Sequence, residues 1–361
     1  MTPIAINGRF LTQKVTGVQR FATEVTLALD SLTAEGAAPP IRLLRPMGGA
    51  PTPFRHLAEE RFGRLQGQGW EQLELPRRAR GAVLVNLGNT APLLAGRRQA
   101  VVIHDAGVFD TPETYPLAFR AWYRALHMAL PRCGARILTV SEFSRARIAD
   151  CLRLDPARIG VVPEGGEHIL REPADASVLT RHGLEPGRFV LVVGTRAAHK
   201  NLDGLREAAG LLAGHGLTLA AVGAADPHVF RPAAGVAGPA ALALGRVSDA
   251  ELRALYEAAL CLVFPSRYEG FGLPPLEAMT CGCPVLAAAS GAVPEVCGDA
   301  ALWFDTAGPR RLTDALTRLL EEPGLPAELR RRGLARAAMF SWRRAAETLL
   351  RLLPSPKDSV A

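Results

Sequence analysis

Residues 266–277, with the sequence SRYEGFGLPPLE, combine the residue types that bind phosphate groups and hydroxyl groups. They follow an apolar run, LCLVFP, that is typical of a buried strand. Pro274 and Pro275 are favoured in the first turn of a helix, while Gly270 and Gly272 allow the backbone to approach a ligand closely. Because a helix N-terminus attracts anions, this segment predicts a phosphate-binding loop between a strand and a helix.

Two carboxylates belong to this segment. Glycine and proline residues between Glu269 and Glu277 prevent them from sharing one continuous helical face, so we expect Glu269 in the loop and Glu277 in the first helical turn. A first-turn glutamate could accept hydrogen bonds from both hydroxyls of a ribose, and a loop glutamate could orient a sugar ring or stabilise developing positive charge. Two simpler interpretations remain: Glu277 could merely complement the helix dipole, worth about 0.3–1 kcal/mol, and Glu269 could simply be exposed.

A second candidate for phosphate binding follows another apolar run, RFVLVVGT. Arg196 and Lys200 lie in the loop after it, where both could reach a diphosphate. The chain has only three lysines, Lys14, Lys200 and Lys357, among 42 basic residues, so a lysine at this position indicates a local requirement. An ammonium binds phosphate as a point charge and a guanidinium binds it bidentately. Together the two cations could neutralise a departing diphosphate.

Apolar runs alternate with helical patterns along the whole chain, which predicts strands joined by crossover helices and therefore parallel sheets. The pattern breaks at residues 163–166 and starts again, so we predict an α/β protein with two Rossmann-like doubly wound domains, residues 1–167 and 168–340. Because such sheets bind ligands at the carboxyl ends of their strands, the site should lie in a central cleft that the two domains face. We expect strands at PIAIN, QAVVIHD, ARILTV, RIGVVP, RFVLVVGT, LTLAAVG, ALALG, LCLVFP and PVLAAA, and helices at residues 18–32, 117–130, 143–152, 202–213 and 250–259, with mostly helix beyond residue 313.

The N-terminal domain contributes further candidates. His104 and Asp105 end the strand VVIHD at the expected cleft; a lone histidine is more often structural, and we expect Asp105 to cap the neighbouring loop. Gly17 lies just before the helix that starts at Val18, so the amides around it could bind an anion. A plain tight turn explains Gly17 equally well.

These motifs together resemble the retaining glycosyltransferase family four, the group 1 glycosyl transferases, which have the GT-B fold. The sequence EGFGLPPLE followed by A-M-x-x-G-x-P-V resembles the family's E-x7-E signature, G-T-R-x-x-x-K-N resembles its diphosphate-binding segment, and I-H-D matches a segment near its donor sugar. The resemblance extends from Gly17 to Trp342 and is weak in residues 48–82, which would help to form the acceptor site.

The resemblance implies a retaining transfer of a hexosyl unit from a nucleotide-diphosphate sugar to a hydroxyl of a glycan or lipid-linked acceptor. The nucleoside diphosphate would leave an oxocarbenium-like sugar, which the acceptor attacks on the same face while a donor phosphate oxygen takes its proton. Overall similarity leans slightly toward GDP-mannose-type enzymes of bacterial surface polysaccharide synthesis. The residues assigned to catalysis are His104, Glu269, Arg196 and Lys200, and those assigned to donor binding are Gly17, Arg196, Lys200, Gly270, Phe271, Gly272, Leu273 and Glu277.

The resemblance also bears on cofactors and on the C-terminus. The sequence has no Asp-x-Asp motif, so we expect no metal ion and no cofactor besides the sugar nucleotide as co-substrate. NLGNT, residues 86–90, follows another apolar run that predicts a strand, and it matches family loops on the acceptor side. Residues 341–361 should form a helix that packs back on the N-terminal domain and ends in a frayed tail.

Two other functions remain compatible with these features. A sugar-nucleotide epimerase can share two Rossmann-like domains and a diphosphate site, and a catalytically inactive nucleotide-binding module would keep part of the same site. A dinucleotide oxidoreductase is less favoured, because Gly270-Phe271-Gly272-Leu273-Pro274-Pro275 lacks the last glycine of GxGxxG and follows a late strand.

Charge and composition limit the partners. The net charge of the 361 residues is +7, and residues 1–167 hold 21 Lys and Arg against 15 Asp and Glu. Arginines 77, 78, 80, 97 and 98 could attract anionic lipid headgroups at a membrane surface or a phosphate-bearing acceptor, although a solvated surface explains them as well. We expect no nucleic-acid partner. No apolar run approaches the roughly 18 residues of a membrane span and no signal peptide is present, which predicts a cytoplasmic protein, and cysteines without a CxxC pair suggest neither disulfides nor a zinc site.

Overall fold

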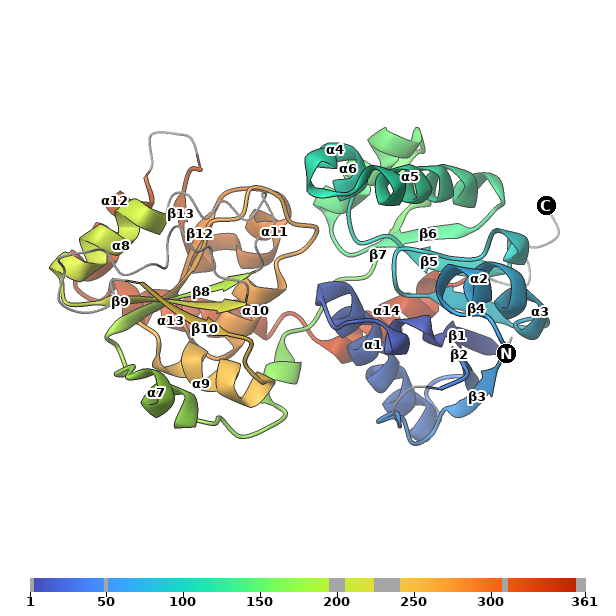
Figure 1. Ribbon diagram of the computed structural model, residues 1–361, viewed down its shortest axis with the longest axis horizontal. Coiled ribbons are helices and arrows are strands. Elements are labelled where there is room, and N and C mark those ends of the chain that lie inside the picture. Colours follow the sequence, from blue (N-terminus) through green and yellow to red (C-terminus); the bar gives the residue numbers. More distant parts are fainter. Residues whose placement is uncertain (1–2, 49–50, 195–204, 224–240, 307–310, 355–361) are drawn as a thin grey trace. The chain divides into compact units, whose positions relative to one another are not determined.

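The computed structural model describes residues 3–48, 51–194, 205–223, 241–306 and 311–354, and the chain forms two compact α/β units (Figure 1). Unit 1 comprises residues 1–164 and 341–361, and unit 2 comprises residues 165–340. The chain therefore passes from the first unit to the second at Glu164, a few residues before the boundary expected after residue 167, and returns to unit 1 at Ser341.

The sheet of unit 1 has seven strands in the order β3-β2-β1-β4-β5-β6-β7, all pairing in parallel. β1 pairs with β2 on one side and β4 on the other, so the strand order reverses between β1 and β4. The strands are β1 (Ile4–Asn7), β2 (Ile41–Pro46), β3 (Ala58–Phe62), β4 (Val83–Asn86), β5 (Gln99–Val102), β6 (Arg136–Thr139) and β7 (Gly160–Val161). The helices are α1 (Gly17–Ala34), α2 (Gly67–Gly69), α3 (Leu75–Arg78), α4 (Gly107–Asp110), α5 (Leu117–Arg132), α6 (Glu142–Leu152) and α14 (Trp342–Leu352).

Unit 2 repeats this plan with a six-stranded sheet in the order β10-β9-β8-β11-β12-β13, again parallel throughout. Its strand order reverses between β8 and β11. The strands are β8 (Phe189–Gly194), β9 (Thr218–Gly223), β10 (Ala241–Gly245), β11 (Cys261–Phe264), β12 (Val285–Ala288) and β13 (Ala301–Phe304). The helices are α7 (Ser177–His182), α8 (Leu205–Gly214), α9 (Asp249–Ala258), α10 (Leu273–Thr280), α11 (Val293–Cys297), α12 (Leu312–Glu321) and α13 (Leu325–Ala337).

All the predicted strands are present, because each is a short apolar run that helices cover on both faces of a parallel sheet. All residues of β1, β4, β5, β11 and β12 are buried. β2 and β13 were not among the predicted strands, and neither was β3, whose sequence AEERF carries three charged residues. β3 lies at the edge of the sheet, where charged residues are tolerated and discourage pairing with other chains.

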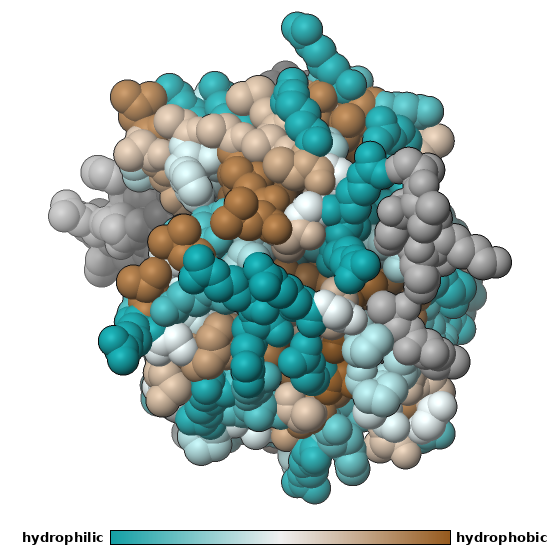
Figure 2. Space-filling model, turned by 90° about the vertical axis from the view of Figure 1, so that its right-hand side faces the viewer, coloured by the Kyte–Doolittle hydropathy of each residue, from teal (hydrophilic) through white to brown (hydrophobic). Residues whose placement is uncertain are grey.

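No helix in the described part of the chain is both long and apolar enough to cross a bilayer. On the face in Figure 2, hydrophobic residues lie in separate patches between hydrophilic side chains.

Helix α14 belongs to unit 1 although it follows the whole of unit 2 in the sequence. It contacts α1, and Trp342 at its start is buried with its ring centroid 6.0 Å from that of Phe21. At the surface, the Arg343 guanidinium donates two hydrogen bonds to Glu35, at 2.7 and 2.8 Å. The last helix, α14, therefore packs on the first helix, α1, and forms part of the core of unit 1.

We predict that Trp342→Ala destabilises unit 1 by about 3–5 kcal/mol, because it leaves a large cavity against α1. The measurement is urea-induced unfolding followed with a probe in unit 1. Arg343→Ala, which removes the exposed ion pairs with Glu35 and Glu347, is the matched control and should have little effect. Equal effects of the two substitutions would contradict this account of α14.

Candidate functional site

The segment from Ser266 to Gly272 connects β11 to α10, as the sequence predicted. Since β11 pairs with β8 at the reversal of the strand order, the loop lies at the switch point of the sheet, where doubly wound proteins bind ligands. Gly272 has φ +110 and forms the N-cap of α10, a conformation that favours glycine. The strand–loop–helix arrangement is confirmed.

Helix α10 begins at Leu273, earlier than expected, and the prediction that Glu277 lies in its first turn is wrong. Pro274 and Pro275 occupy that turn and have no N–H to offer, and the Leu276 amide donates to the Gly272 carbonyl at 3.3 Å. The first turn of α10 is therefore a poor source of amide donors. A phosphate bound here would depend on amides of the loop itself and on nearby cationic side chains.

Glu277 is only 7% exposed, and both of its carboxylate oxygens accept hydrogen bonds. His168 Nε2 donates to Oε1 at 2.9 Å, and the Tyr256 hydroxyl donates to Oε2 at 3.0 Å. Burial, reinforced by the Glu277 charge, raises the pKa of Tyr256 well above its usual value, so the tyrosine stays protonated as a donor. Because a carboxylate has about four acceptor positions, this arrangement fixes the orientation of Glu277 and leaves capacity for ligand hydroxyls.

Glu269 is half-buried in the loop, and its backbone rests on the segment that follows β12. The Ala292 amide donates to the Glu269 carbonyl at 3.0 Å, and Ser290 Oγ donates to the Ser266 carbonyl at 2.6 Å. Gly291 has φ +60, and a Cβ there would lie 2.6 Å from the Glu269 carbonyl oxygen. Gly291 thus allows the close approach that supports the loop, a role that sequence reasoning missed.

Phe271 and Leu273, both assigned to donor binding, differ in their exposure. The Phe271 ring is 5% exposed and packs edge-to-face on Phe340 with centroids 5.9 Å apart, whereas Leu273 is half-buried. The ring of Phe271 therefore holds the loop against Phe340, at the end of unit 2. A ligand would meet the backbone at this position rather than the aromatic face.

In unit 1, His104 follows β5 and is buried among three neighbours. Its Nε2 donates to the Leu87 carbonyl at 3.0 Å, its Nδ1 lies 3.8 Å from Glu164 Oε1, and its ring meets Phe21 edge-on at 4.8 Å. The ring therefore joins the ends of β4 and β7 at the carboxyl edge of the sheet. Asp105 caps the following loop as predicted, since its Oδ1 accepts from the Gly107 amide at 2.7 Å.

Asn89, in the NLGNT loop, holds two histidines in place. It has φ +65, which is uncommon for a residue other than glycine. Its Oδ1 accepts from the His104 amide at 2.8 Å, and its carbonyl accepts from His127 Nε2 at 2.9 Å. Burial lowers the pKa of His127 to about 4, although the bond to the Asn89 carbonyl opposes this effect, so His127 is neutral near pH 7.

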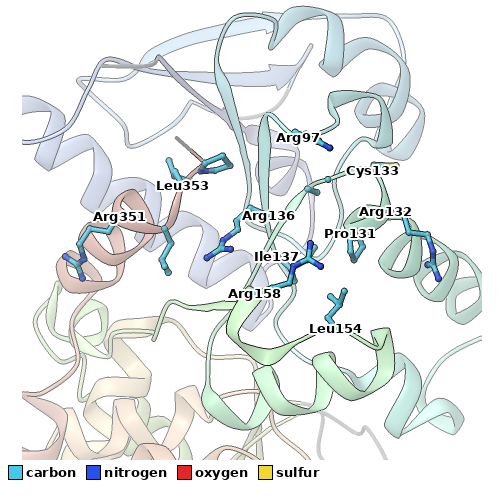
Figure 3. A pocket seen from close by; sticks show the side chains of 14 residues that line it. Arg97, Pro131, Arg132, Cys133, Arg136, Ile137, Leu154, Arg158, Arg351 and Leu353 are labelled. Carbon is cyan, nitrogen blue, oxygen red and sulfur yellow. The ribbon is translucent and has the colours of Figure 1, made fainter. Parts of the chain in front are cut away.

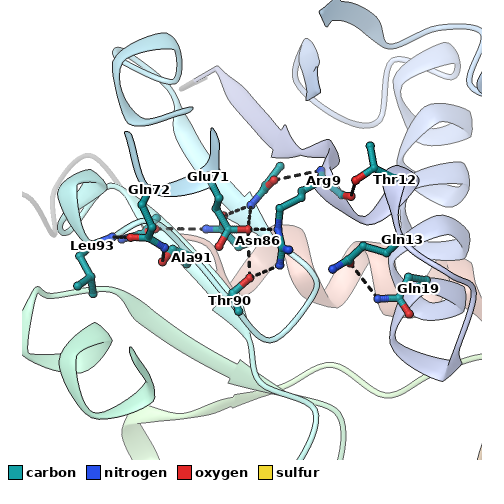
Figure 4. Close-up of polar contacts among 12 residues, drawn as sticks. Arg9, Thr12, Gln13, Gln19, Glu71, Gln72, Asn86, Thr90, Ala91 and Leu93 are labelled. Carbon is teal, nitrogen blue, oxygen red and sulfur yellow. Dashed lines mark hydrogen bonds and ion pairs between the residues drawn. The ribbon is translucent and has the colours of Figure 1, made fainter. Parts of the chain in front are cut away.

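A polar network lies beside the reversal of strand order in unit 1 and includes Asn86 and Thr90 of the NLGNT loop, which was expected on the acceptor side (Figure 4). No role was predicted for Arg9 or Glu71. Arg9 Nε donates to Glu71 Oε2 at 2.5 Å and Arg9 Nη2 to Thr90 Oγ1 at 2.6 Å. The side-chain Nδ2 of Asn7 donates to Glu71 Oε2 at 3.1 Å and to Asn86 Oδ1 at 2.9 Å. Glu71 Oε1 is buried and has no hydrogen-bond partner among the described residues. The only sequence clue was that polar residues follow the apolar runs of β1 and β4.

Gly17 is the first residue of α1, and its φ is not in the left-handed region. A Cβ at this position would meet nothing within 4 Å, so neither a tight turn nor packing requires glycine here. Gly17 begins an 18-residue helix whose N-terminus has a capping box between Thr16 and Gln19, and the anion contact at this helix start stays a prediction.

Arg196 and Lys200 lie outside the described residues. In the sequence they follow β8, the strand that pairs with β11 and therefore neighbours the loop from Ser266 to Gly272.

A family profile described as "Glycosyl transferases group 1" matches residues 181–336. O-antigen chain mannosyltransferase B of Escherichia coli is 34% identical to this chain over 256 residues, which cover 68% of this chain and 67% of that protein. The chain belongs to the group 1 glycosyltransferases. MMP alpha-(1->4)-mannosyltransferase of Mycolicibacterium hassiacum is 32% identical over 238 residues, covering 63% of this glycosyltransferase and 56% of that relative.

Two solved structures resemble this glycosyltransferase over nearly its full length. WaaG, a glycosyltransferase involved in lipopolysaccharide biosynthesis, has a TM-score of 0.68 at 15% identity and covers 98% of this chain and 100% of its own. Anabaena Alr3699/HepE in complex with UDP and glucose has a TM-score of 0.71 at 17% identity, and the match covers 97% of this chain and 98% of that structure's chain. These likenesses establish the GT-B fold that the sequence motifs implied.

We predict that Gly291→Ala lowers the transfer rate of this glycosyltransferase far more than Gly298→Ala does. Both glycines have positive φ values, +60 and +56, so alanine strains the backbone at both positions. Only at position 291 would the Cβ collide with the Glu269 backbone, because the nearest atom at position 298 lies 3.5 Å away. The measurement is the initial rate for each variant, with melting temperature as the check on folding. Equal rates would show that the Glu269 loop does not depend on this contact.

A second prediction concerns His127. Below its unfolded-state pKa of about 6.5, the unfolded chain binds a proton that the folded protein accepts only near pH 4, so stability should fall as the pH drops through this window. The shift corresponds to about 3 kcal/mol. In His127→Gln, which keeps a donor for the Asn89 carbonyl, this part of the acid destabilisation should disappear from unfolding curves measured between pH 7 and 4. In His56→Gln, a substitution at an exposed position, the acid destabilisation that comes from His127 should remain.

Proposed function

We propose that this glycosyltransferase moves a hexosyl unit, most specifically a mannosyl unit, from a nucleotide-diphosphate sugar to a hydroxyl of a glycan or lipid-linked acceptor, with retention of configuration. The observation that carries the proposal is the loop from Ser266 to Gly272 at the switch point of unit 2, followed by a buried Glu277 that His168 and Tyr256 hold in one orientation. A buried, oriented carboxylate suits the recognition of neighbouring hydroxyls such as those of a ribose.

The transfer assigns separate tasks to these residues. The loop amides around Gly270, together with Arg196 and Lys200, bind the diphosphate and stabilise the charge that develops as it leaves. Glu269 orients the sugar as the bond to the diphosphate oxygen breaks. The acceptor hydroxyl then bonds to the anomeric carbon on the same face, and its proton passes to an oxygen of the departing phosphate. Catalysis rests on positioning and electrostatic stabilisation.

The identity of the sugar is supported by the relatives, which include O-antigen and MMP mannosyltransferases. The O-antigen relative also supports a role in bacterial surface polysaccharide synthesis. On the acceptor side, we assign the carboxyl edge of the unit 1 sheet, where His104 is buried and Glu71 keeps an unpartnered oxygen among the described residues. That edge is rich in hydrogen-bonding groups, as a hydroxyl-rich acceptor requires.

We further propose that the reaction needs no metal ion, since the cations Arg196 and Lys200 supply the charge beside the diphosphate. Among the described residues, no three His, Cys, Asp or Glu side chains gather into a group suited to a metal ion. We place the reaction in the cytoplasm, where nucleotide sugars are available, with the basic surface of unit 1 able to approach an anionic membrane.

The test begins with a screen of thermal stabilisation by GDP, UDP, ADP and dTDP, which should select GDP if the donor is GDP-mannose. A ligand at 100 times its dissociation constant raises the unfolding free energy by about 2.7 kcal/mol. Transfer from the matching sugar nucleotide is then measured with NMR of the product anomer, and retention is expected. A new sugar nucleotide formed without acceptor would indicate an epimerase instead, and tight nucleotide binding without turnover would indicate an inactive binding module.

In the same assay, we expect Lys200→Ala to lower kcat by about 10²–10³, the loss typical of removing one electrostatic contact to a transition state. Arg206→Ala, which removes an exposed cation on α8 six residues later in the sequence, is the matched control and should retain activity. Near-normal turnover of Lys200→Ala would refute the assignment of the diphosphate site.

A further inference from the structure

A cavity of about 690 Å³ opens in unit 1 at the edge of the sheet where the strands begin (Figure 3). Arg136 is the first residue of β6, and Arg97 lies two residues before β5. The far side of the cavity is formed by the end of α14, whose Leu352 packs on Gly160 at the start of β7. His104 follows the opposite end of β5, so this cavity is separate from the candidate transfer site.

Five arginines line the cavity, and its described lining contains no acidic residue. Figure 3 shows Arg136 and Arg158 in its middle and Arg97 nearby, with Arg132 and Arg351 toward its sides. Among the described residues, neither Arg136 nor Arg158 has a carboxylate partner for its side chain. The acidic residue closest to Arg158 in the sequence, Asp155, accepts from the Ala157 amide at 2.9 Å.

The backbone around the cavity makes room for these cations. Gly134 has φ +84, and a Cβ there would lie 2.4 Å from the Cγ of Arg97, so the arginine stem lies directly over the glycine. Apolar side chains, Ile137 and Leu154 among them, form part of the wall. Four of the five arginines are exposed and Arg136 is half-buried, so solvent reduces the repulsion between their like charges without removing it.

We propose that this cavity is a binding site for a phosphate-bearing ligand with at least two negative charges, distinct from the sugar-nucleotide site. Guanidinium groups bind phosphate oxygens bidentately, which explains why arginine rather than lysine gathers here. The apolar wall offers contact to a group attached to the phosphate. A free diphosphate and a phosphorylated lipid headgroup present the same chemistry, and the experiment below distinguishes them.

Cys133 provides a local reporter of occupancy, because it lines the cavity and is half-buried. Cys151 is also half-buried but lies outside the cavity lining, and the other four cysteines are buried. We expect pyrophosphate at ten times its dissociation constant to slow the alkylation of Cys133 by N-ethylmaleimide about tenfold. Alkylation of Cys151, followed by mass spectrometry in the same sample, should not change.

The pocket variant combines Arg97→Gln, Arg136→Gln and Arg158→Gln, and it should lose this protection. The matched control combines Arg55→Gln, Arg64→Gln and Arg98→Gln, three exposed positions in unit 1 that remove the same charge outside the cavity and should keep protection. Since the pocket variant removes repelling charges, its melting temperature without ligand should not fall. If it fails to fold, Arg158→Gln alone, at an exposed position, should weaken protection measurably.

A parallel experiment replaces pyrophosphate with phosphatidylglycerol vesicles, with phosphatidylcholine vesicles as the neutral comparison. Protection by pyrophosphate supports a free phosphate ligand, and protection by the anionic vesicles alone supports a lipid headgroup. The proposal is overturned if neither protects Cys133, or if protection is equal in the pocket variant and the control variant.

Discussion

The candidate sites depend on one feature of both sheets, the reversal of strand order next to the first strand of each unit. That strand is β1 in unit 1 and β8 in unit 2. Crossover connections on the two sides of the reversal leave in opposite directions, so the loops at the carboxyl ends separate and leave a crevice. In unit 1 the crevice receives the segments after β1 and β4, and in unit 2 it receives residues 266–272 after β11. The position of the chemistry follows from the winding of the sheets.

A buried carboxylate lies at each of these crevices. Burying a carboxylate is costly unless hydrogen bonds compensate for the lost water, and the two units do so differently. Glu71 pairs with the guanidinium of Arg9, whereas Glu277 accepts from His168 and from Tyr256. In both cases the bonds fix the carboxylate before a ligand arrives. A carboxylate that is buried and already oriented accepts a hydrogen bond from a ligand hydroxyl without first reorganising. This is the physical advantage of a buried carboxylate at each crevice.

Local features of this fold were predictable from the sequence, whereas long-range ones were not. The apolar run before Ser266 and the glycines after it predicted a strand, a loop and a helix because each depends on neighbouring residues. The bonds of Glu277 join residues 109 and 21 positions apart, so no local pattern reveals that its carboxylate is buried. The prolines predicted that α10 begins at Pro274, but the left-handed Gly272 caps the helix and α10 begins one residue earlier, at Leu273.

The net positive charge of the N-terminal half does not reveal where the charged residues lie on the sheet of unit 1. At the carboxyl edge of unit 1, the buried Arg9 is neutralised by Glu71, whereas at the opposite edge Arg136 and Arg158 have no carboxylate partner among the described residues. The two edges lie about 20 Å apart, judged from the rise of an extended chain between Arg97 and His104. Physiological salt screens charges beyond about 8 Å. The arginines of the cavity therefore act electrostatically at their own edge of the sheet and contribute little at the carboxyl edge. The two edges of this parallel sheet thus differ in charge environment, and neither edge determines that of the other.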